Sequence, residues 1–204
     1  MNKLNLKIPG KHNVSNAMAV LEVAKILKIS RERAVKTLNN FSGTWRRMEY
    51  RGKINDAKIF DDYGHHPTEI KATLEGAKEL ITKNYKLKTN LWCVFQPHQY
   101  QRTYKLFSQF ISAFDAADKT IILQIYSVPG REKESIKKKV SSEKLVDAVN
   151  RKQLTVNNNK KHIVYIDNFK KAKNYLAKNL KKGDVCLIMG AGDINKLTEM
   201  LLGK

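Results

Sequence analysis

The sequence predicts an α/β protein in which a mostly parallel β-sheet is flanked by helices and preceded by a short helical segment. From residue 47 onward, apolar runs of about six residues alternate with longer segments of helical periodicity, which is typical of parallel sheets. Before residue 44 the apolar residues recur only at helical spacing. With 204 residues, 42% of them hydrophobic, the chain is long and apolar enough to bury a core.

The N-terminal segment is expected to hold two helices. The first is predicted to start after an N-cap at Asn13 and to run to about Lys28, and the second to start after Ser30 and to end near Asn40. Their apolar positions share one helical face: Val14, Ala17, Met18, Leu21 and Ala24 in the first helix, Ala34, Val35 and Leu38 in the second. Gly43 then marks a boundary between this segment and the α/β part.

The rest of the chain divides into an edge strand and five strand-helix units. The predicted strands are 47–54 at the edge, then 57–62, 90–96, 119–126, 162–166 and 184–189; the predicted helices are 67–83, 102–117, 142–150, 168–180 and 191–202. The charged stretch Ser127–Lys139 is expected to be a loop. The apolar stripe from Leu106 to Phe114 is interpreted as core packing.

Composition argues against several classes of function. The chain has 39 Lys and Arg against 19 Asp and Glu, a net charge of +20, but its Lys-rich stretches contain no interleaved aromatics, so nucleic-acid binding is not favoured. Cys93 and Cys186 lie in apolar runs, which favours buried reduced thiols over a disulfide. No run reaches the roughly 20 apolar residues of a membrane span, and the start lacks a signal-peptide core, so we expect a cytoplasmic protein without a membrane partner.

Ligands of such sheets bind where the loops leave the carboxyl ends of the strands. The polar segments predicted at these ends are Asp61–Pro67, Gln96–Arg102 and Gly190–Asp193, together with Tyr126. Arg102, beside His98 at a helix start, suits a carboxylate or phosphate group. Nearer the N-terminus, His12 and Asn16 lie one helical turn apart and could meet a nucleobase or a phosphate.

These segments also have simpler interpretations. The paired acids and histidines of DDYGHHP could bind a metal, but no third ligand follows at helical spacing, so we expect no metal site there. Asp61 and His66 are expected to cap the following helix and to satisfy the turn. Gly190 and Gly192 lack the third glycine of a dinucleotide fingerprint and are better explained by a tight chain reversal.

Taken in order, six segments resemble the C-terminal part of a Mur ligase over essentially the whole chain. They read PGKHNVSNA, FSGTWRRM, DDYGHHPTEI, FQPHQYQRT, SSEKL and MGAGDI. The pattern is most similar to the branch of the family that joins L-alanine to UDP-N-acetylmuramate. The resemblance implies that residues 1–44 are the tail of a central ATPase domain and residues 45–204 a complete, Rossmann-like C-terminal domain.

The resemblance also implies a reaction and its partners. ATP, with Mg²⁺, phosphorylates the carboxylate of UDP-N-acetylmuramate, and the amine of L-alanine attacks the acyl phosphate. The N-terminal and central domains of the full enzyme would supply the nucleotide-sugar site and most Mg²⁺ ligands. Gly-Lys occurs at Gly10-Lys11, Gly52-Lys53 and Gly203-Lys204, and none is followed by Ser or Thr, so the sequence contains no P-loop and the chain alone is expected to be inactive.

Residue roles follow from the resemblance. The expected ATP-binding residues are His12, Asn16, Arg46, Arg47 and Asp62. The expected amino-acid pocket consists of Tyr63, His65, His98 and Arg102, with His65 and Arg102 as the catalytic pair. Gln99 stands where the family pattern usually has Arg, which leaves Arg102 as the expected cation for the substrate carboxylate.

Three other functions stay open at this point. Within the family, the recycling ligase that joins a tripeptide to the same nucleotide sugar fits the same motifs. A non-catalytic nucleotide-binding or interaction module would keep the fold without the ATPase half. Nucleic-acid binding has only the net charge in its favour.

Overall fold

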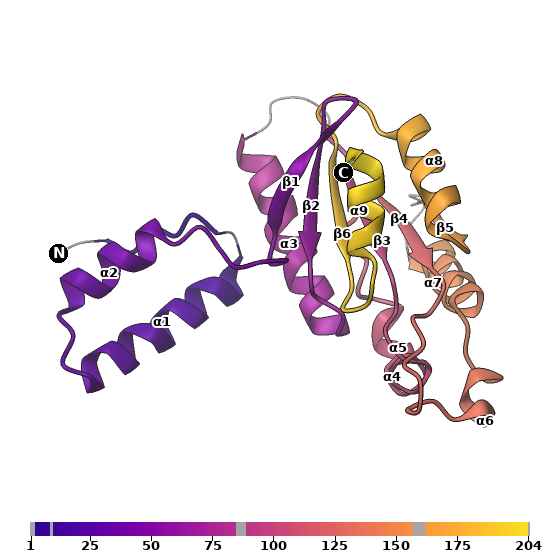
Figure 1. Ribbon diagram of the computed structural model, residues 1–204, viewed down its shortest axis with the longest axis horizontal. Helices are drawn as coiled ribbons and strands as arrows, with labels where there is room; N and C mark the ends of the chain where they lie inside the picture. The colour runs from indigo at the N-terminus through magenta and orange to yellow at the C-terminus, as the bar shows by residue number, and fades with distance from the viewer. Residues whose placement is uncertain (1–2, 9, 85–88, 157–161, 204) are drawn as a thin grey trace.

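A computed structural model describes residues 3–8, 10–84, 89–156 and 162–203. Within these residues, six strands form one sheet in the order β1-β2-β6-β3-β4-β5 (Figure 1). The strands are β1 Glu49–Ile54, β2 Ala57–Asp62, β3 Leu91–Phe95, β4 Lys119–Leu123, β5 His162–Ile166 and β6 Val185–Met189. Among these described strands, only β1 runs antiparallel to its neighbour. The predicted fold class, a mostly parallel sheet with an edge strand near residue 50, is confirmed.

Helices cover both faces of this sheet. The helices of the described residues are α1 Lys11–Ile26, α2 Arg31–Asn40, α3 Pro67–Asn84, α4 Tyr100–Lys105, α5 Phe107–Phe110, α6 Glu134–Lys137, α7 Ser142–Val156, α8 Phe169–Asn179 and α9 Asn195–Leu202, of which five pack on the sheet. Helices α3, α5 and α7 pack on one face, and α8 and α9 on the other. Successive residues of a strand point to opposite faces of the sheet. Cys93 lies in the apolar layer under α3, α5 and α7, and Cys186 lies in the layer under α8 and α9. Both thiols are buried and free, as predicted.

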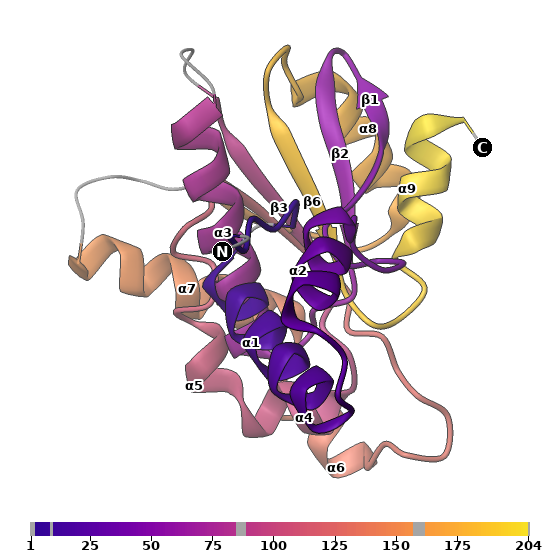
Figure 2. The same cartoon turned by 90° about the vertical axis from the view of Figure 1, so that its left-hand side faces the viewer.

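Helices α1 and α2 extend away from the sheet as a separate hairpin (Figures 1 and 2). Their small shared core contains Leu21, Ala24, Ala34 and Val35. The Ser30 side chain accepts a hydrogen bond from Arg33 N at 3.3 Å, which confirms the predicted N-cap of α2. The predicted N-cap of α1 is wrong: the helix begins at Lys11, because Gly10, at φ 99°, already turns the chain into it and Asn13 N donates to Gly10 O.

The predicted helix 102–117 is also wrong as a continuous element. It is broken at Leu106 into α4 and α5, and turns follow to residue 116. Phe110 and Phe114 both contact Phe95 of β3, with ring centroids 5.6 and 5.5 Å apart, so the apolar stripe packs on the sheet although the helix is not continuous. The interpretation of this stripe as core is confirmed. The strand predicted to 126 ends at Leu123, and the predicted loop 127–139 contains the short helix α6.

The exposed apolar side chains of α1 lead to a prediction about local stability. Val14 and Met18 are about half exposed and Ile26 is 78% exposed, whereas every residue of β3 and β6 is buried. We therefore expect amides of residues 13–40 to exchange hydrogen earlier than those of β3 and β6. Hydrogen exchange followed by mass spectrometry checks this, and equal protection of both regions would contradict it. In the described residues, no helix is long and apolar enough to cross a membrane.

Candidate active site

The three polar segments predicted at strand ends meet at one edge of the sheet. In the strand order, β6 lies between β2 and β3, and Asp62 and Phe95 both pair with Met189. Backbone hydrogen bonds continue beyond the strands: Gly190 N donates to Asp62 O at 3.1 Å, and Gln96 N to Met189 O at 3.0 Å. The loops after β2, β3 and β6 are therefore held side by side, as expected for a ligand site in a parallel sheet.

The four residues predicted for the amino-acid pocket lie in one continuous row. The ring centroids of Tyr63 and His65 are 5.7 Å apart, and those of His65 and His98 are 5.9 Å apart. Arg102 Nη1 lies 3.4 Å from His98 Nδ1. Tyr126, which the sequence placed among the strand-end residues but not in the amino-acid pocket, stacks on His98 at 5.3 Å and 13° and forms a parallel bridge with it.

Hydrogen bonds fix the protonation pattern of the two histidines. His65 Nδ1 lies 3.1 Å from the Tyr63 carbonyl, which can only accept, so Nδ1 carries the proton and Nε2 keeps its lone pair. Arg102 can only donate, so His98 Nδ1 accepts and His98 Nε2 carries the proton. Burial lowers the pKa of both histidines, and the Arg102 charge lowers each pKa further. The lowered pKa favours the neutral form of both rings at pH 7.

Four of the five predicted ATP residues line one cavity of about 490 Å³ between the α1–α2 hairpin and the sheet. They are His12, Asn16, Arg47 and Asp62. The walls also include apolar side chains such as Val20, Leu38 and Phe41. Apolar walls with a few convergent polar groups, at this size, suit a nucleotide base with its sugar.

Asp62 shapes one wall of this cavity. Its carboxylate accepts hydrogen bonds from Gly64 N at 2.8 Å and from Met48 N at 3.0 Å. Burial raises the pKa of Asp62, while these two N–H donors oppose the shift. A Cβ atom at Gly64 would lie 2.6 Å from Asp62 Oδ1, so this tight turn requires glycine. Through these two hydrogen bonds, Asp62 links Met48, just before β1, to Gly64 in the loop after β2.

Arg46 does not line the cavity. Its side chain is 3% exposed, and its guanidinium donates to Gly190 O at 2.5 Å and to Gly192 O at 3.3 Å. The expectation that Arg46 contacts ATP is therefore corrected, because its side chain is buried outside the cavity and its two terminal nitrogens donate to backbone carbonyls. The neighbouring Arg47 is exposed and lines the cavity.

The structure also separates the roles expected for Asp61 and His66. His66 Nδ1 accepts from Thr68 N at 3.3 Å, so His66 does cap α3. Asp61 does not cap α3. It is buried, its Oδ1 accepts a hydrogen bond from the hydroxyl of Thr198 on α9, and its Oδ2 lies 3.8 Å from Arg51 Nε. Side chains of adjacent strand residues point to opposite faces, which explains why Asp61 and Asp62 have different partners.

Glu69 is a site residue that the sequence prediction missed. Its Oε2 accepts from His65 N and His66 N at 3.0 and 3.1 Å and lies 3.6 Å from His65 Nδ1. Burial alone would raise the pKa of Glu69, but these N–H donors and the charge of nearby groups lower it overall. The available signal was its position in the first turn of the helix, where a Glu reaches back to free backbone N–H groups.

The described residues do not fit a resident magnesium ion. Among them, no three His, Cys, Asp or Glu side chains are arranged to hold a metal ion. Asp62 and Glu69 already accept backbone N–H groups. These carboxylates are therefore committed to backbone contacts and are not arranged as Mg²⁺ ligands.

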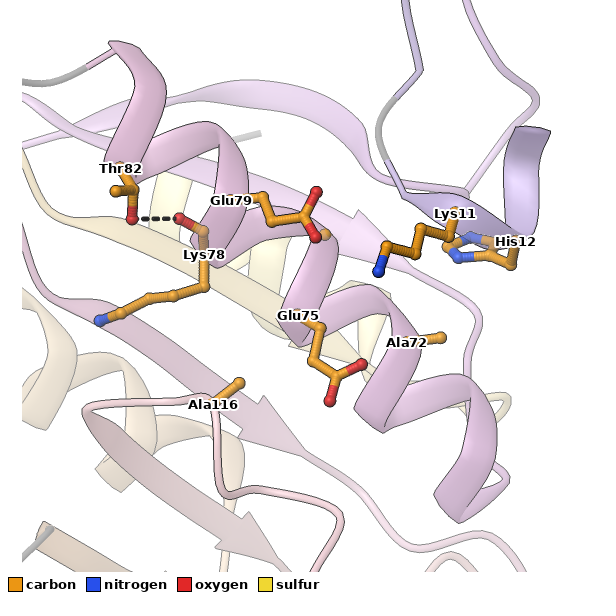
Figure 3. Close-up of a pocket in the computed structure, with 9 residues that line it drawn as sticks. Lys11, His12, Ala72, Glu75, Lys78, Glu79, Thr82 and Ala116 are labelled. Atoms are coloured by element: carbon orange, nitrogen blue, oxygen red, sulfur yellow. Dashed lines mark hydrogen bonds between the residues drawn. The ribbon is translucent and has the colours of Figure 1, made fainter.

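A larger hollow of about 570 Å³ lies outside this site (Figure 3). Lys11 and His12 at the start of α1 border it, and the Lys11 side chain extends toward Glu75 and Glu79 on the outer face of α3. Apart from His12, it contains none of the predicted site residues. Its larger volume does not make this hollow the candidate site, because the polar residues at the strand ends do not line it.

A parallel sheet with a neutral histidine pair, an arginine and a nucleotide-sized cavity at its strand ends defines a substrate-binding α/β domain of an enzyme. Residues 46–192 match the family model described as "Mur ligase, glutamate ligase domain". The chain belongs to the Mur ligase family.

Curated relatives and solved structures resemble this chain over nearly its whole length. The UDP-N-acetylmuramate–L-alanine ligase of Clostridium acetobutylicum is 41% identical over 201 residues, which are 98% of this chain and 40% of the relative. A UDP-N-acetylmuramate-alanine ligase structure from Thermotoga maritima superposes with a TM-score of 0.75 at 24% identity, over 100% of this chain and 40% of that one. A murein peptide ligase from Psychrobacter arcticus gives 0.67 at 27% identity, over 98% and 38%. The chain spans about two-fifths of the length of the curated relatives it matches.

Proposed function

We propose that this chain is the C-terminal portion of an ATP-dependent ligase that joins L-alanine to UDP-N-acetylmuramate. In this proposal residues 1–44 belong to the central ATPase domain and residues 45–204 form the C-terminal domain. The names of the curated relatives support the substrates. The observation that carries the proposal is the row of Tyr63, His65, His98 and Arg102 beside a cavity that contains four predicted ATP residues. Its use of ATP favours a cytoplasmic location.

The reaction has two steps that share this edge of the sheet. ATP transfers its γ-phosphoryl group to the muramyl carboxylate and leaves ADP and an acyl phosphate. The amine of L-alanine then attacks the acyl carbon, the amide bond forms, and inorganic phosphate leaves. Such steps depend on positioning and charge stabilisation. Asp62 and the N-terminal hairpin would hold the base and ribose, and the exposed guanidinium of Arg47 would face the phosphates.

The histidine pair suits the second step. Alanine arrives as an ammonium ion, which must lose a proton before its nitrogen can attack. His65, neutral and with a free lone pair on Nε2, would accept that proton. Arg102 would bind the alanine carboxylate, and the Nε2 proton of His98 would offer it a second donor.

The recycling ligase of the same family is the second candidate. The murein peptide ligase from Psychrobacter arcticus supports it, since 27% identity and a TM-score of 0.67 extend over nearly the whole chain. Gln99, in place of the usual Arg, also leaves room for an acceptor other than alanine. Acceptor specificity therefore decides between the two candidates.

The proposal predicts that this chain turns over ATP only when joined to the missing half. Alone it should release no phosphate from ATP, because its sequence offers no P-loop for the β- and γ-phosphates. A chimaeric ligase, made by joining residues 1–204 to the part of the Clostridium acetobutylicum relative that precedes the match, should release phosphate when UDP-N-acetylmuramate and L-alanine are both present. Phosphate release and mass spectrometry of the product measure this.

Four outcomes separate the candidates. Product formed with L-alanine supports the proposed function, and product formed only with a tripeptide supports the recycling ligase. Steady ATP turnover by the chain alone, lost in Asp62→Asn, would contradict the division of labour between the two halves. A folded chimaera without product on either acceptor would favour a non-catalytic module.

A further inference from the structure

Arg46 is a buried cation to which the proposed reaction assigns no part. It is 3% exposed and has a left-handed backbone conformation, with φ 51°. A buried guanidinium is unfavourable unless hydrogen bonds satisfy it. Two of its nitrogens donate to the carbonyls of Gly190 and Gly192, while its Nε is buried without a partner among the described residues. An unfavourable conformation and an incompletely satisfied charge indicate a function at this position.

On one side, Arg46 holds the wall of the pocket that carries His65. The backbone carbonyl of Arg46 accepts from Tyr63 N at 2.6 Å, and its guanidinium carbon lies 5.3 Å from the Tyr63 ring centroid. The carbonyl of Tyr63 in turn fixes the proton of His65 on Nδ1. A shift of Arg46 is therefore transmitted through Tyr63 to the orientation and tautomer of His65.

On the other side, Arg46 holds the wall that carries His98. It binds the turn of Gly190 and Gly192, and Gly192 lies directly against Tyr126. A Cβ atom at Gly192 would lie 2.7 Å from Tyr126 Cγ and 2.8 Å from Gln96 Oε1. Because the Tyr126 ring stacks on His98, the position of Gly192 sets the position of His98.

We propose that Arg46 is a positioning residue that joins the two walls of the amino-acid pocket and so sets the spacing between His65 and His98. The proposal rests on the function proposed above for the same site. Arg46 touches neither ATP nor the amino acid. It acts through Tyr63 on one histidine and through Gly192 and Tyr126 on the other.

Kinetics of the chimaeric ligase provide the first test. Arg46→Met should lower kcat/KM for L-alanine by about 100-fold, the usual effect of misplacing a reacting group by about 1 Å, and should leave KM for ATP unchanged. Arg46→Lys should recover part of this loss, because one ammonium group can still donate to one of the two carbonyls. Arg47→Met should show the opposite pattern, a higher KM for ATP.

Nitrogen-15 spectra of the five histidine rings in the 204-residue chain provide a second test that needs no activity. In the parent chain, the signals of His65 and His98 should show opposite tautomers. In Arg46→Met both should change toward mixed tautomers, whereas the signal of His162 on β5 stays constant. Arg151→Met, which removes an exposed arginine on α7, is the matched control and should change neither. Gly192→Ala, which pushes against Tyr126, should alter His98 even if Arg46→Met does not fold.

The outcomes are distinguishable from failure of the proposed function. If the chimaera is inactive, the proposed function fails, and the histidine spectra still decide the role of Arg46. Unchanged spectra in both Arg46→Met and Gly192→Ala would overturn the positioning role. A higher KM for ATP in Arg46→Met, with KM for alanine unchanged, would instead make Arg46 a phosphate ligand.

Discussion

Replacing Arg102 with alanine is expected to lower kcat/KM for L-alanine by at least about 30-fold in the chimaeric ligase. The change removes a cation from the end of the histidine row and leaves the substrate carboxylate without its charged donor. Truncating one partner of a buried charge pair typically costs about 2 to 5 kcal/mol. Arg102 is only partly buried, so we expect the lower part of this range, and 2 kcal/mol corresponds to about 30-fold. Steady-state kinetics with varied alanine measure the effect.

The same helix supplies a matched control for this experiment. Lys105→Ala removes an exposed cation from the end of α4 and should leave alanine kinetics unchanged. Gln99→Arg should leave activity unchanged or lower KM for alanine, since it restores the usual cation of the family. If Arg102→Ala is neutral while Gln99→Arg abolishes activity, the carboxylate has been assigned to the wrong residue.

Replacing His65 with glutamine is expected to reduce kcat by about 100- to 10,000-fold, the usual range for loss of a positioned general base. The parent enzyme should also lose activity on the acid side as His65 becomes protonated. Because burial and the Arg102 charge lower the pKa of His65 from 6.5, the protonated form dominates only below that value. The acid limb of kcat/KM should therefore lie below pH 6.5. In His65→Gln this limb should disappear from profiles recorded between about pH 5 and 8.

His66 provides the neighbouring control. His66→Asn keeps a side-chain acceptor for Thr68 N at the start of α3 and leaves the histidine row intact, so its kcat and pH profile should match the parent. An acid limb that persists in His65→Gln would assign the titrating group to another residue. A limb above pH 6.5 in the parent would contradict the lowered pKa.

Most helices and strands could be predicted, because the buried apolar residues of each recur at the spacing typical of that element. Strands β2 and β5 have the predicted bounds, and their neighbours differ by a few residues at the ends. The errors arose where the backbone conformation changes at a residue that the apolar pattern does not single out. At Leu106 the helix breaks although Phe110 and Phe114 still reach Phe95, and at Gly10 a positive φ starts α1 three residues early.

The sequence could predict which residues form most of the candidate site, but not the contacts that those residues make. Motifs and strand ends identified Tyr63, His65, His98 and Arg102, which the structure brings together. They could not separate Arg46 from Arg47, because two adjacent arginines look alike in a sequence. The distinction comes from a left-handed residue and from carbonyls 144 and 146 positions away along the chain. Tyr126 was expected at a strand end, and its stacking on His98 is what assigns it to the amino-acid pocket.

The two cysteines lie one in each apolar layer, so their reactivity can report where the chain unfolds. Burial raises the pKa of both thiols, so neither forms the reactive thiolate while its layer is closed. An alkylating reagent reaches Cys93 only when the layer under α3 and α7 opens, and Cys186 only when the layer under α8 and α9 opens. Equal labelling rates mean that the sheet opens as one cooperative unit, and unequal rates identify the layer that separates first.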